Sequence, residues 1–409
     1  MTDARAAATS FSVRVHVLGA GPVGLFLTAL LQAQEGFSVR LCEKRSDYTR
    51  TRMVKLAPYL VADTLESYQV DPIDGDNIAA LFDRDELEAG LAFRQSIPDD
   101  LMSLLRAWTQ GFCPLNTIER SLSDLIEARG SGVERVSAAL TAEDAMQMLE
   151  PGDVLIDCTG CKSLLRDHLE PDARGAVDGA NTVTFRLENA IVVTFLYGGP
   201  YACNEFCKYY KNVQNPAYKF IPAVDRTHFD GNLSHVTGIV VISPEEFAAM
   251  PPRFDGAWLR DNFPRVAASM DRFIDQVRQE APGDIVGDLE IIRIPLDLYR
   301  ARNATSRKWH EGALRGHPFA AAPVFLAGDS AIGTPYFQAI SLGFECAMFL
   351  AGLLARRDLP IAQVFDRYEL SIYKQWLRVY MRSKMIKHNK DLFEILDDKM
   401  ALLGKLHIY

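Results

Sequence analysis

The stretch VHVLGAGPVGLFLTALLQAQEGFSVRLCEKR, residues 15–45, constrains most strongly what this chain can fold into. An apolar run at Val13–Leu18 leads into a glycine-rich turn, and an apolar helical pattern then covers Val23–Gln34. A second strand-like run follows at Ser38–Glu43. The order of strand, glycine turn, helix and strand predicts a βαβ unit with parallel strands.

The turn has the spacing GxGxxG, with glycines at 19, 21 and 24. In a dinucleotide-binding unit, Gly19 makes the tight turn, Gly21 lets the backbone approach a diphosphate, and Gly24 lets the helix and strand pack closely. Glu43 ends the second strand, where a carboxylate can bind ribose hydroxyls. The pattern favours dinucleotide binding over a turn used only for packing, and it leaves FAD and NAD both open.

Other parts of the chain repeat this alternation of strands and helices. Strand-like runs lie at Val13–Leu18, Ser38–Glu43, Val154–Cys158, Val183–Leu187, Ile191–Tyr197, Val236–Ile242, Leu289–Ile294 and Val324–Ala327. Helical patterns cover Val23–Gln34, Leu101–Thr109, Ser121–Arg129, Ala142–Leu149, Glu245–Ala249, Trp258–Glu280 and Leu342–Arg356, with a helical tail from Ile361. Strand pairs separated by Pro and Gly in residues 180–300 indicate an antiparallel sheet. We therefore expect an α/β cofactor domain made from both ends of the chain and a β-rich substrate-side domain between them.

Charge and hydropathy narrow the classes of partner. The 409 residues carry a formal net charge of −9, which argues against nucleic acid or an anionic membrane surface as the main partner. No run of eighteen apolar residues is present, so no membrane span is expected. The first twelve residues, MTDARAAATSFS, are interpreted as a short tail rather than a signal peptide.

The chain has seven cysteines and no secretory signal, which indicates reduced thiols and a cytoplasmic protein. Cys158 and Cys161 form a CxxC, and Cys203 and Cys207 form a CxxxC. No histidine follows at zinc-ligand spacing, so buried cysteines are favoured over a zinc site and no metal is expected.

Two later motifs place polar side chains at strand ends. In DVLIDCTGCKSLLR, residues 153–166, a buried strand runs into Asp157 and a turn containing Gly160. In PVFLAGDSAIGTPYFQAISLGFECAMFLAGLL, residues 323–354, a strand ends at Gly328 and Asp329, and an apolar helix leaves near Ser341. A carboxylate there can accept hydrogen bonds from a polyol such as the ribityl chain of FAD, which NAD lacks between its rings.

With these three motifs in this order, the chain resembles the single-component FAD-dependent aromatic hydroxylases, the family of p-hydroxybenzoate hydroxylase and kynurenine hydroxylase. The resemblance covers about half of the chain, at both ends. It implies a Rossmann-like FAD-binding domain of the glutathione-reductase type from residues 1–180 and 290–360. The strand pairs of the middle and the helical pattern of the tail place an interleaved β-sheet substrate domain at 181–289 and a C-terminal helical segment at 361–409.

The resemblance also implies which residues bind the cofactor. EKRSDYTRTRMVKL matches the segment where the family places arginines against the FAD diphosphate, which makes Arg50 and Arg52 candidates with Arg45 behind them. NTIERSLSDLIEA matches a helix start with a flavin-contacting arginine, here Arg120. The cofactor-binding residues implied are Gly19, Gly21, Pro22, Val23, Gly24, Glu43, Lys44, Arg45, Arg52, Arg120, Asp157, Gly160, Gly328, Asp329, Pro335 and Ser341.

The loop before the last helix departs from the family pattern. PYFQAISLG has Tyr336, Phe337 and Gln338 after Pro335, where the family has glycines beside the flavin ring. Residues 335–338 are the candidate flavin-side loop of the catalytic site. On the substrate side, Tyr209, Tyr210 and Arg293 are candidates for gripping an acidic or phenolic molecule.

The activity that the resemblance implies is that of an FAD-dependent monooxygenase. NADPH or NADH binds transiently and reduces the flavin, O2 forms a C4a-hydroperoxide, and one oxygen passes to a small aromatic or heteroaromatic molecule. Two alternatives stay open: an FAD-dependent oxidoreductase without oxygen insertion, such as a halogenase or reductase, and a non-catalytic dinucleotide-binding protein. A monomer or homodimer is expected.

Overall fold

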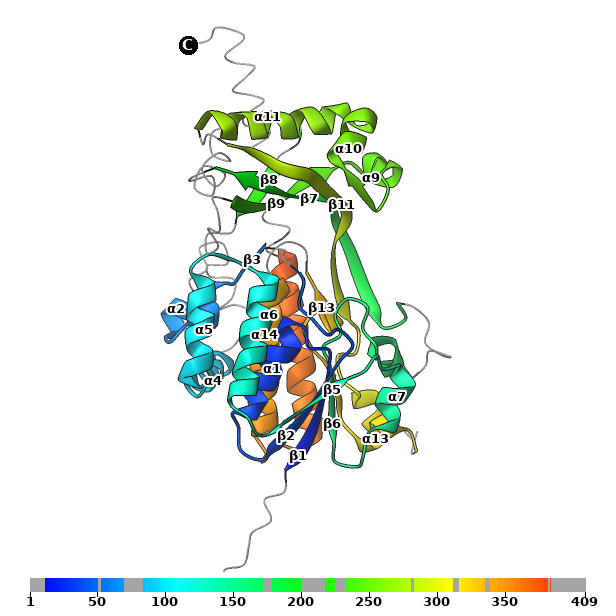
Figure 1. Cartoon of the computed structure of the whole chain (residues 1–409). Helices are drawn as coiled ribbons and strands as arrows, with labels where there is room; N and C mark the ends of the chain where they lie inside the picture. Colours follow the sequence, from blue (N-terminus) through cyan, green and yellow to red (C-terminus); the bar gives the residue numbers. More distant parts are fainter. Residues whose placement is uncertain are drawn as a thin grey trace, which may run out of the picture.

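A computed structural model gives the fold (Figure 1) and describes residues 12–50, 53–69, 84–171, 179–199, 218, 220–224, 233–280, 283–311, 316–334, 339–381 and 383. Two sheets organise these residues, one parallel and one antiparallel. The fold is mixed α/β, as the sequence predicts. No helix among the described residues is both long and apolar enough to cross a membrane.

The parallel sheet has five strands: β1 (Val13–Leu18), β2 (Phe37–Glu43), β5 (Val133–Ser137), β6 (Val154–Asp157) and β12 (Val324–Leu326). They lie in the order β12-β6-β1-β2-β5, with every pair parallel. A parallel sheet is covered on both faces, which explains the continuous apolar runs of β6 and β12. Since the strands are parallel, their carboxyl ends all meet at one edge.

Three helices pack beside this sheet. They are α1 (Pro22–Gln32), α6 (Leu115–Ala128) and α14 (Ala339–Ala355). Helix α1 contacts both α6 and α14, and the Phe26 ring stacks on the Phe344 ring with centroids 4.2 Å apart. Burying a phenylalanine side chain stabilises a fold by about 1.5–3 kcal/mol. These contacts fix the start of α1 against the start of α14.

Further elements and a C-terminal helix complete this part of the molecule. The further elements are α2 (Leu65–Gln69), α4 (Arg84–Gln95), α5 (Asp99–Thr109), α7 (Ala142–Gln147), α12 (Arg307–Glu311), α13 (Pro318–Ala321), β3 (Met53–Lys55), β4 (Phe112–Pro114), and the 3-10 turns η1 (Pro58–Val61), η2 (Arg166–Leu169) and η3 (Gly328–Ser330). Residues 361–381 form the helix expected from Ile361. Tyr368 anchors this helix, because its hydroxyl donates to the carbonyl of Leu326 at 2.7 Å.

The second sheet is antiparallel, as predicted for the middle of the chain. Its strands are β7 (Thr182–Gly198), β8 (Phe220–Val224), β9 (Leu233–Ile242), β10 (Arg253–Asp255) and β11 (Asp284–Ala301), in the order β10-β11-β7-β9-β8. Helices α9 (Pro244–Ala249), α10 (Gly256–Asn262) and α11 (Pro264–Glu280) lie on one face of this sheet, where a second apolar core forms (Figure 1).

Strand β11 links the antiparallel sheet to the carboxyl edge of the parallel one. Its last residues pair with the short strand β13 (Ile332–Gly333), which follows η3. The predicted domain boundary between residues 289 and 290 falls inside β11.

Several predicted elements have other bounds in the structure, and in two places the number of elements changes as well. The runs Val183–Leu187 and Ile191–Tyr197 are one strand, β7, because Glu188 and Asn189 continue the pairing with β11. The helical pattern Trp258–Glu280 is two helices, because the residue before Pro264 is disfavoured in helical conformation and Phe263 adopts φ −133°, ψ 63°.

Candidate functional site

A cavity of about 400 Å³ opens where the carboxyl ends of β1, β2, β6 and β12 meet the start of α14. In open parallel sheets, this edge is where ligands bind. The cavity brings together nine of the predicted cofactor residues: Gly19, Gly21, Pro22, Val23, Glu43, Lys44, Arg45, Gly160 and Asp329. Arg50 also lines it.

The three glycines of the first turn have different surroundings. Gly19 has φ +92°, and a Cβ there would lie 2.8 Å from the carbonyl oxygen of Cys158. A Cβ on Gly24 would overlap the carbonyl oxygen of Gly19. A Cβ on Gly21 would meet only the Arg50 guanidinium, at 3.6 Å. Gly19 and Gly24 thus serve packing, whereas Gly21 leaves an open space in front of the backbone.

Helix α1 begins directly behind that space. Gly21 is its N-cap, Pro22 is its first residue, and the first turn carries no acidic side chain. No side chain of the described residues caps α1. The N–H groups of a first helical turn lack partners within the helix and carry a partial positive charge, so they bind phosphate groups well. The start of α1 fits a diphosphate placed against Gly21.

Glu43 joins the end of β2 to the glycine turn. Its carboxylate accepts the N–H of Ala20 at 2.8 Å, the backbone N–H of Arg45 at 2.9 Å, and two N–H groups of the Arg45 guanidinium at 3.1 and 3.2 Å. Burial raises the pKa of the Glu43 carboxyl, but the hydrogen bonds from Arg45 and Ala20 outweigh burial and hold that pKa below its ordinary value. Glu43 is therefore ionised and positioned near a ribose site, with Arg45 as its present partner.

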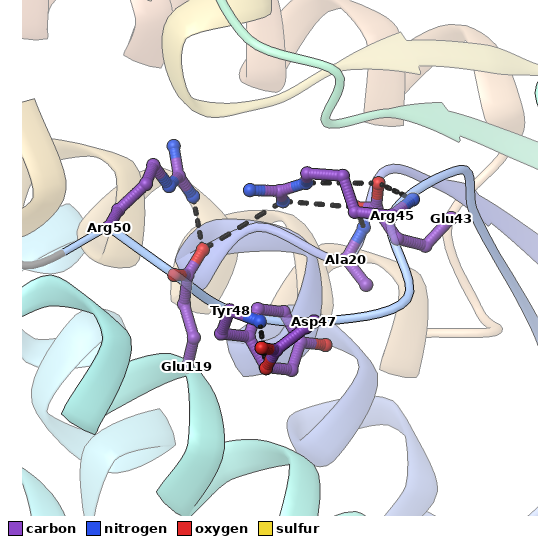
Figure 2. A network of polar contacts seen from close by, with 7 residues as sticks. All are labelled: Ala20, Glu43, Arg45, Asp47, Tyr48, Arg50 and Glu119. Carbon is purple, nitrogen blue, oxygen red and sulfur yellow. Dashed lines mark hydrogen bonds and ion pairs between the residues drawn. The ribbon is translucent and has the colours of Figure 1, made fainter.

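A chain of alternating charges runs from Glu43 through Arg45 and Glu119 to Arg50 (Figure 2). The Arg45 guanidinium bonds Glu43 and lies 3.9 Å from Oε1 of Glu119. Oε1 of Glu119 also pairs with Arg50. The backbone of Arg50 is fixed too, since its carbonyl accepts the N–H of Asn116 at 2.9 Å. Glu119 was not predicted from the sequence.

Arg120, which the resemblance marks as flavin-contacting, is not among the residues lining the cavity. Its side chain is 54% exposed, donates to the carbonyl of Tyr48 at 2.9 Å and lies 3.6 Å from Asp47. The neighbouring Glu119 faces the cavity arginines instead. A role for Arg120 at the flavin stays a prediction.

Asp157 lies beneath the cavity, fully buried at the end of β6. Its carboxylate accepts the N–H and hydroxyl of Thr159, the hydroxyls of Ser163 and Ser330, and the N–H of Leu165. The residues that follow it, Cys158 to Gly160, line the cavity. Asp157 therefore shapes the turn that carries Gly160.

The Gly328–Asp329 motif forms η3, which rests on the start of α1. Gly328 has φ +61°, and a Cβ there would lie 3.0 Å from the Val23 side chain. The carbonyl of Asp329 accepts the Tyr299 hydroxyl at 2.7 Å, and the Arg166 guanidinium lies 5.3 Å from the Tyr299 ring centroid. Burial, with a smaller effect of Asp329, raises the pKa of the Tyr299 phenol, so the hydroxyl stays protonated as a donor. These contacts tie β11 to the cavity.

Two further predicted residues, Ser341 and Arg293, do not line the cavity. Ser341 is buried, and its hydroxyl accepts the N–H of Ala57 at 2.9 Å. The Arg293 guanidinium donates to the carbonyl of Phe247 at 2.6 Å and stands over the Phe247 ring. Seven further candidates lie outside the described residues: Arg52, Tyr209, Tyr210, Pro335, Tyr336, Phe337 and Gln338.

Cysteines and other metal ligands do not gather in the described part of the chain. Cys158 is buried and Cys161 is exposed, and burial raises the pKa of the Cys158 thiol well above its ordinary value. Among the described residues, no group of three His, Cys, Asp or Glu side chains could hold a metal ion. Cys203 and Cys207 lie outside those residues.

A second cavity, of about 750 Å³, lies between α4, the later turns of α14 and residues 367–375. Its lining is mostly apolar, and it includes the buried charges Arg94 and Glu345. Arg378 donates to Glu345 at 2.8 Å. This buried ion pair joins α14 to the C-terminal helix.

No protein-family model matches the chain, and no curated protein matches its sequence. Solved structures match over most of its length. The Diels-Alderase PyrE3 of pyrroindomycin biosynthesis has a TM-score of 0.51 and 14% identity, with 95% of this chain and 77% of that chain covered. BexE, studied for oxidation during BE-7585A biosynthesis, has a TM-score of 0.50 and 15% identity, with 95% and 73% covered. The likeness shows that the chain shares the fold of these enzymes.

Proposed function

We propose that the chain is an FAD-dependent oxidoreductase whose cofactor lies in the cavity at the carboxyl edge of the parallel sheet. The observation that carries this proposal is the space at Gly21, which combines the start of α1 with the Arg50 guanidinium. A dinucleotide diphosphate is an anion that needs close backbone approach, a helix N-terminus and a cation. The shared fold with BexE, whose study concerns oxidation, is consistent with redox chemistry.

Different residues of the chain would bind different parts of FAD. The first turn of α1, with Arg50 and Lys44, would bind the diphosphate, and Glu43 would accept ribose hydroxyls. Because the Glu43 carboxylate already accepts four N–H groups, a ribose hydroxyl would replace one of the Arg45 bonds. FAD, when bound, supplies two-electron chemistry that protein side chains lack. In this proposal residues 1–180 and 290–360 form the FAD domain, 181–289 the substrate domain, and 361–409 a helical segment.

The finer proposal is a monooxygenase acting on a small aromatic or heteroaromatic molecule in the cytoplasm. The balanced reaction consumes NADPH or NADH, a proton, O2 and the substrate, and gives the oxidised nicotinamide, water and the hydroxylated product. The family resemblance of the three motifs supports it. The glycine-poor sequence of residues 335–338 favours a second candidate, an FAD oxidoreductase that does not insert oxygen, because bulky side chains stand where the resemblance expects glycines.

Anaerobic reduction followed by isotope labelling separates these candidates. The holoprotein is mixed with NADPH or NADH without oxygen, and loss of the flavin absorbance is followed with and without a panel of phenols and heteroaromatic acids. A monooxygenase is expected to show substrate-stimulated reduction and, with labelled O2, label in the product. Reduction with no label in any product would favour the second candidate. A flavin that neither nicotinamide reduces under any condition would contradict both.

A further inference from the structure

Glu119 is a fully buried negative charge placed on the apolar face of α6. The buried apolar residues of this helix, Leu115, Ile118, Leu122 and Ile126, recur at helical spacing. Glu119 stands four residues after Leu115 and three before Leu122, so it lies on the same face, with 0% of its side chain exposed. A buried carboxylate destabilises a fold unless a cation compensates it. Its presence on this face calls for an explanation beyond packing.

The partner of Glu119 is the cation that stands at the glycine turn. One terminal nitrogen of Arg50 pairs with Oε1 of Glu119, and the same nitrogen lies 3.6 Å from the position of a Cβ on Gly21. Figure 2 shows the other terminal nitrogen of Arg50 directed away from Glu119. The Arg50 side chain is 43% exposed. It is therefore fixed by Glu119 on one side, while the rest of its surface faces solvent.

Oε2 of Glu119 is buried and, among the described residues, has no hydrogen-bond partner. The Arg45 guanidinium approaches the other oxygen, Oε1, to 3.9 Å. The carboxylate therefore keeps the capacity to bind a second guanidinium, while both arginines lie along the cavity. Arg45 is already bonded to Glu43, so Arg50, which lies beside Gly21, is the cation that Glu119 can present to a bound anion.

We infer that Glu119 is a positioning residue for the dinucleotide diphosphate, acting through Arg50; this inference rests on the proposed function. An arginine has five N–H donors in a planar fork, so it can bind a carboxylate with one edge and a phosphate with another. Anchoring one edge on Glu119 removes side-chain freedom that diphosphate binding would otherwise have to remove. Because Arg50 carries the opposite charge to Glu119 and pairs with it directly, it offsets the repulsion between that carboxylate and the diphosphate.

The alternative is that Glu119 competes with the diphosphate for Arg50 and weakens dinucleotide binding. The two accounts predict opposite effects of Glu119→Gln, which keeps the shape of the side chain and removes its charge. If Glu119 positions Arg50, the variant loses affinity for FAD, by about ten-fold for a buried charge-assisted pair. If Glu119 competes, the variant gains affinity.

The test measures dissociation constants of the apoprotein for FAD and for ADP, by quenching of flavin fluorescence and by calorimetry. The variants are Glu119→Gln, Arg50→Gln and the double variant, with Glu127→Gln as the control, because Glu127 is an exposed carboxylate on the same helix. Thermal unfolding of each apoprotein shows which variants are folded. We expect each single variant to bind both ligands more weakly, the double variant to bind no more weakly than Arg50→Gln, and the control to match the wild type.

A purely structural role of Glu119 would give a different pattern. The loss of affinity would then persist in the Arg50→Gln background, because it would not pass through Arg50. That pattern, or unchanged or tighter binding by folded Glu119→Gln, overturns the inference and leaves the proposed function intact when the wild type binds FAD. Wild-type protein that binds neither FAD nor ADP overturns both.

Discussion

The hydroxyl of Ser330 donates to Oδ1 of Asp157 at 3.1 Å, although 173 residues separate the two in the chain. This bond connects the loop after β12 to the end of β6 beneath the cavity. The same Ser330 oxygen accepts the N–H of Gly160 at 3.1 Å. The middle and late motifs are thus one hydrogen-bonded unit under the cavity floor.

Asp157→Asn is expected to destabilise the protein. The amide nitrogen of Asn would face donors that now bond to a carboxylate oxygen, and an unmet buried donor costs about 1–3 kcal/mol. Urea unfolding should therefore give a loss of about 2–4 kcal/mol in the free energy of unfolding, whereas Ser330→Ala should lose about 1 kcal/mol. A loss below about 0.5 kcal/mol for Asp157→Asn would show that the hydrogen-bond unit contributes little.

Glu345→Gln is expected to be destabilising for a different reason. Glu345 and Arg378 are both nearly fully buried, with side chains 5% and 6% exposed, and neutralising one member leaves a buried charge. Breaking such a pair costs about 3–5 kcal/mol. The control is Glu88→Gln, since Glu88 pairs with Arg84 on the exposed surface of α4, where a pair contributes about 0.3–0.5 kcal/mol. Equal effects of the two substitutions on urea unfolding would contradict the account.

Gly21→Ala separates cofactor binding from folding. Gly21 has φ −74° and ψ −178°, which any residue can adopt, and a Cβ there meets only the Arg50 guanidinium. The melting temperature of the apoprotein should therefore change little, while FAD binds at least about ten-fold more weakly because the methyl group fills the approach to the backbone. Gly111→Ala is the matched control, because a Cβ on Gly111 meets nothing within 4 Å. Unchanged FAD affinity in Gly21→Ala would contradict the assignment of this space to the diphosphate.

Acid should weaken the fold partly through Glu43. Its pKa in the folded protein lies below the ordinary value of 4.5, so the ionised form stabilises the fold at pH values above 4.5. That contribution is lost as the pH falls below 4.5 through the lowered folded pKa. Melting temperatures of the apoprotein measured from pH 6 to about pH 3 should fall more steeply for the wild type than for Glu43→Gln. Parallel curves would show that the Glu43 bonds contribute no pH dependence.

The first βαβ unit could be predicted from sequence because its apolar runs are also the segments that the fold buries. Val13–Leu18 is β1 without change of bounds, and Glu43 lies beside the glycine turn as expected. The sequence patterns did not predict helix α4 or strand β5. Helix α4 is largely polar, and three of the five residues of β5 are exposed. Neither gives the apolar runs on which the other elements were recognised.

Glu119 was missed because α6 was predicted to begin at Ser121, whereas it begins at Leu115. With the longer helix, the apolar spacing of Leu115, Ile118 and Leu122 would have placed position 119 on the buried face and 120 beside it. The charge at 119 would then have stood out. The ion pair with Arg50 could not be predicted, since it depends on how the segment after β2 crosses the start of α6.

The absorption spectrum of the purified protein decides whether the cavity binds FAD. The purified protein is incubated with FAD, freed of unbound cofactor by gel filtration, and its visible spectrum is recorded beside that of Gly21→Ala. We expect flavin bands in stoichiometric amount for the wild type and much weaker bands for the variant. A wild-type protein that is folded by circular dichroism and elutes without flavin bands would show that the cavity does not bind FAD.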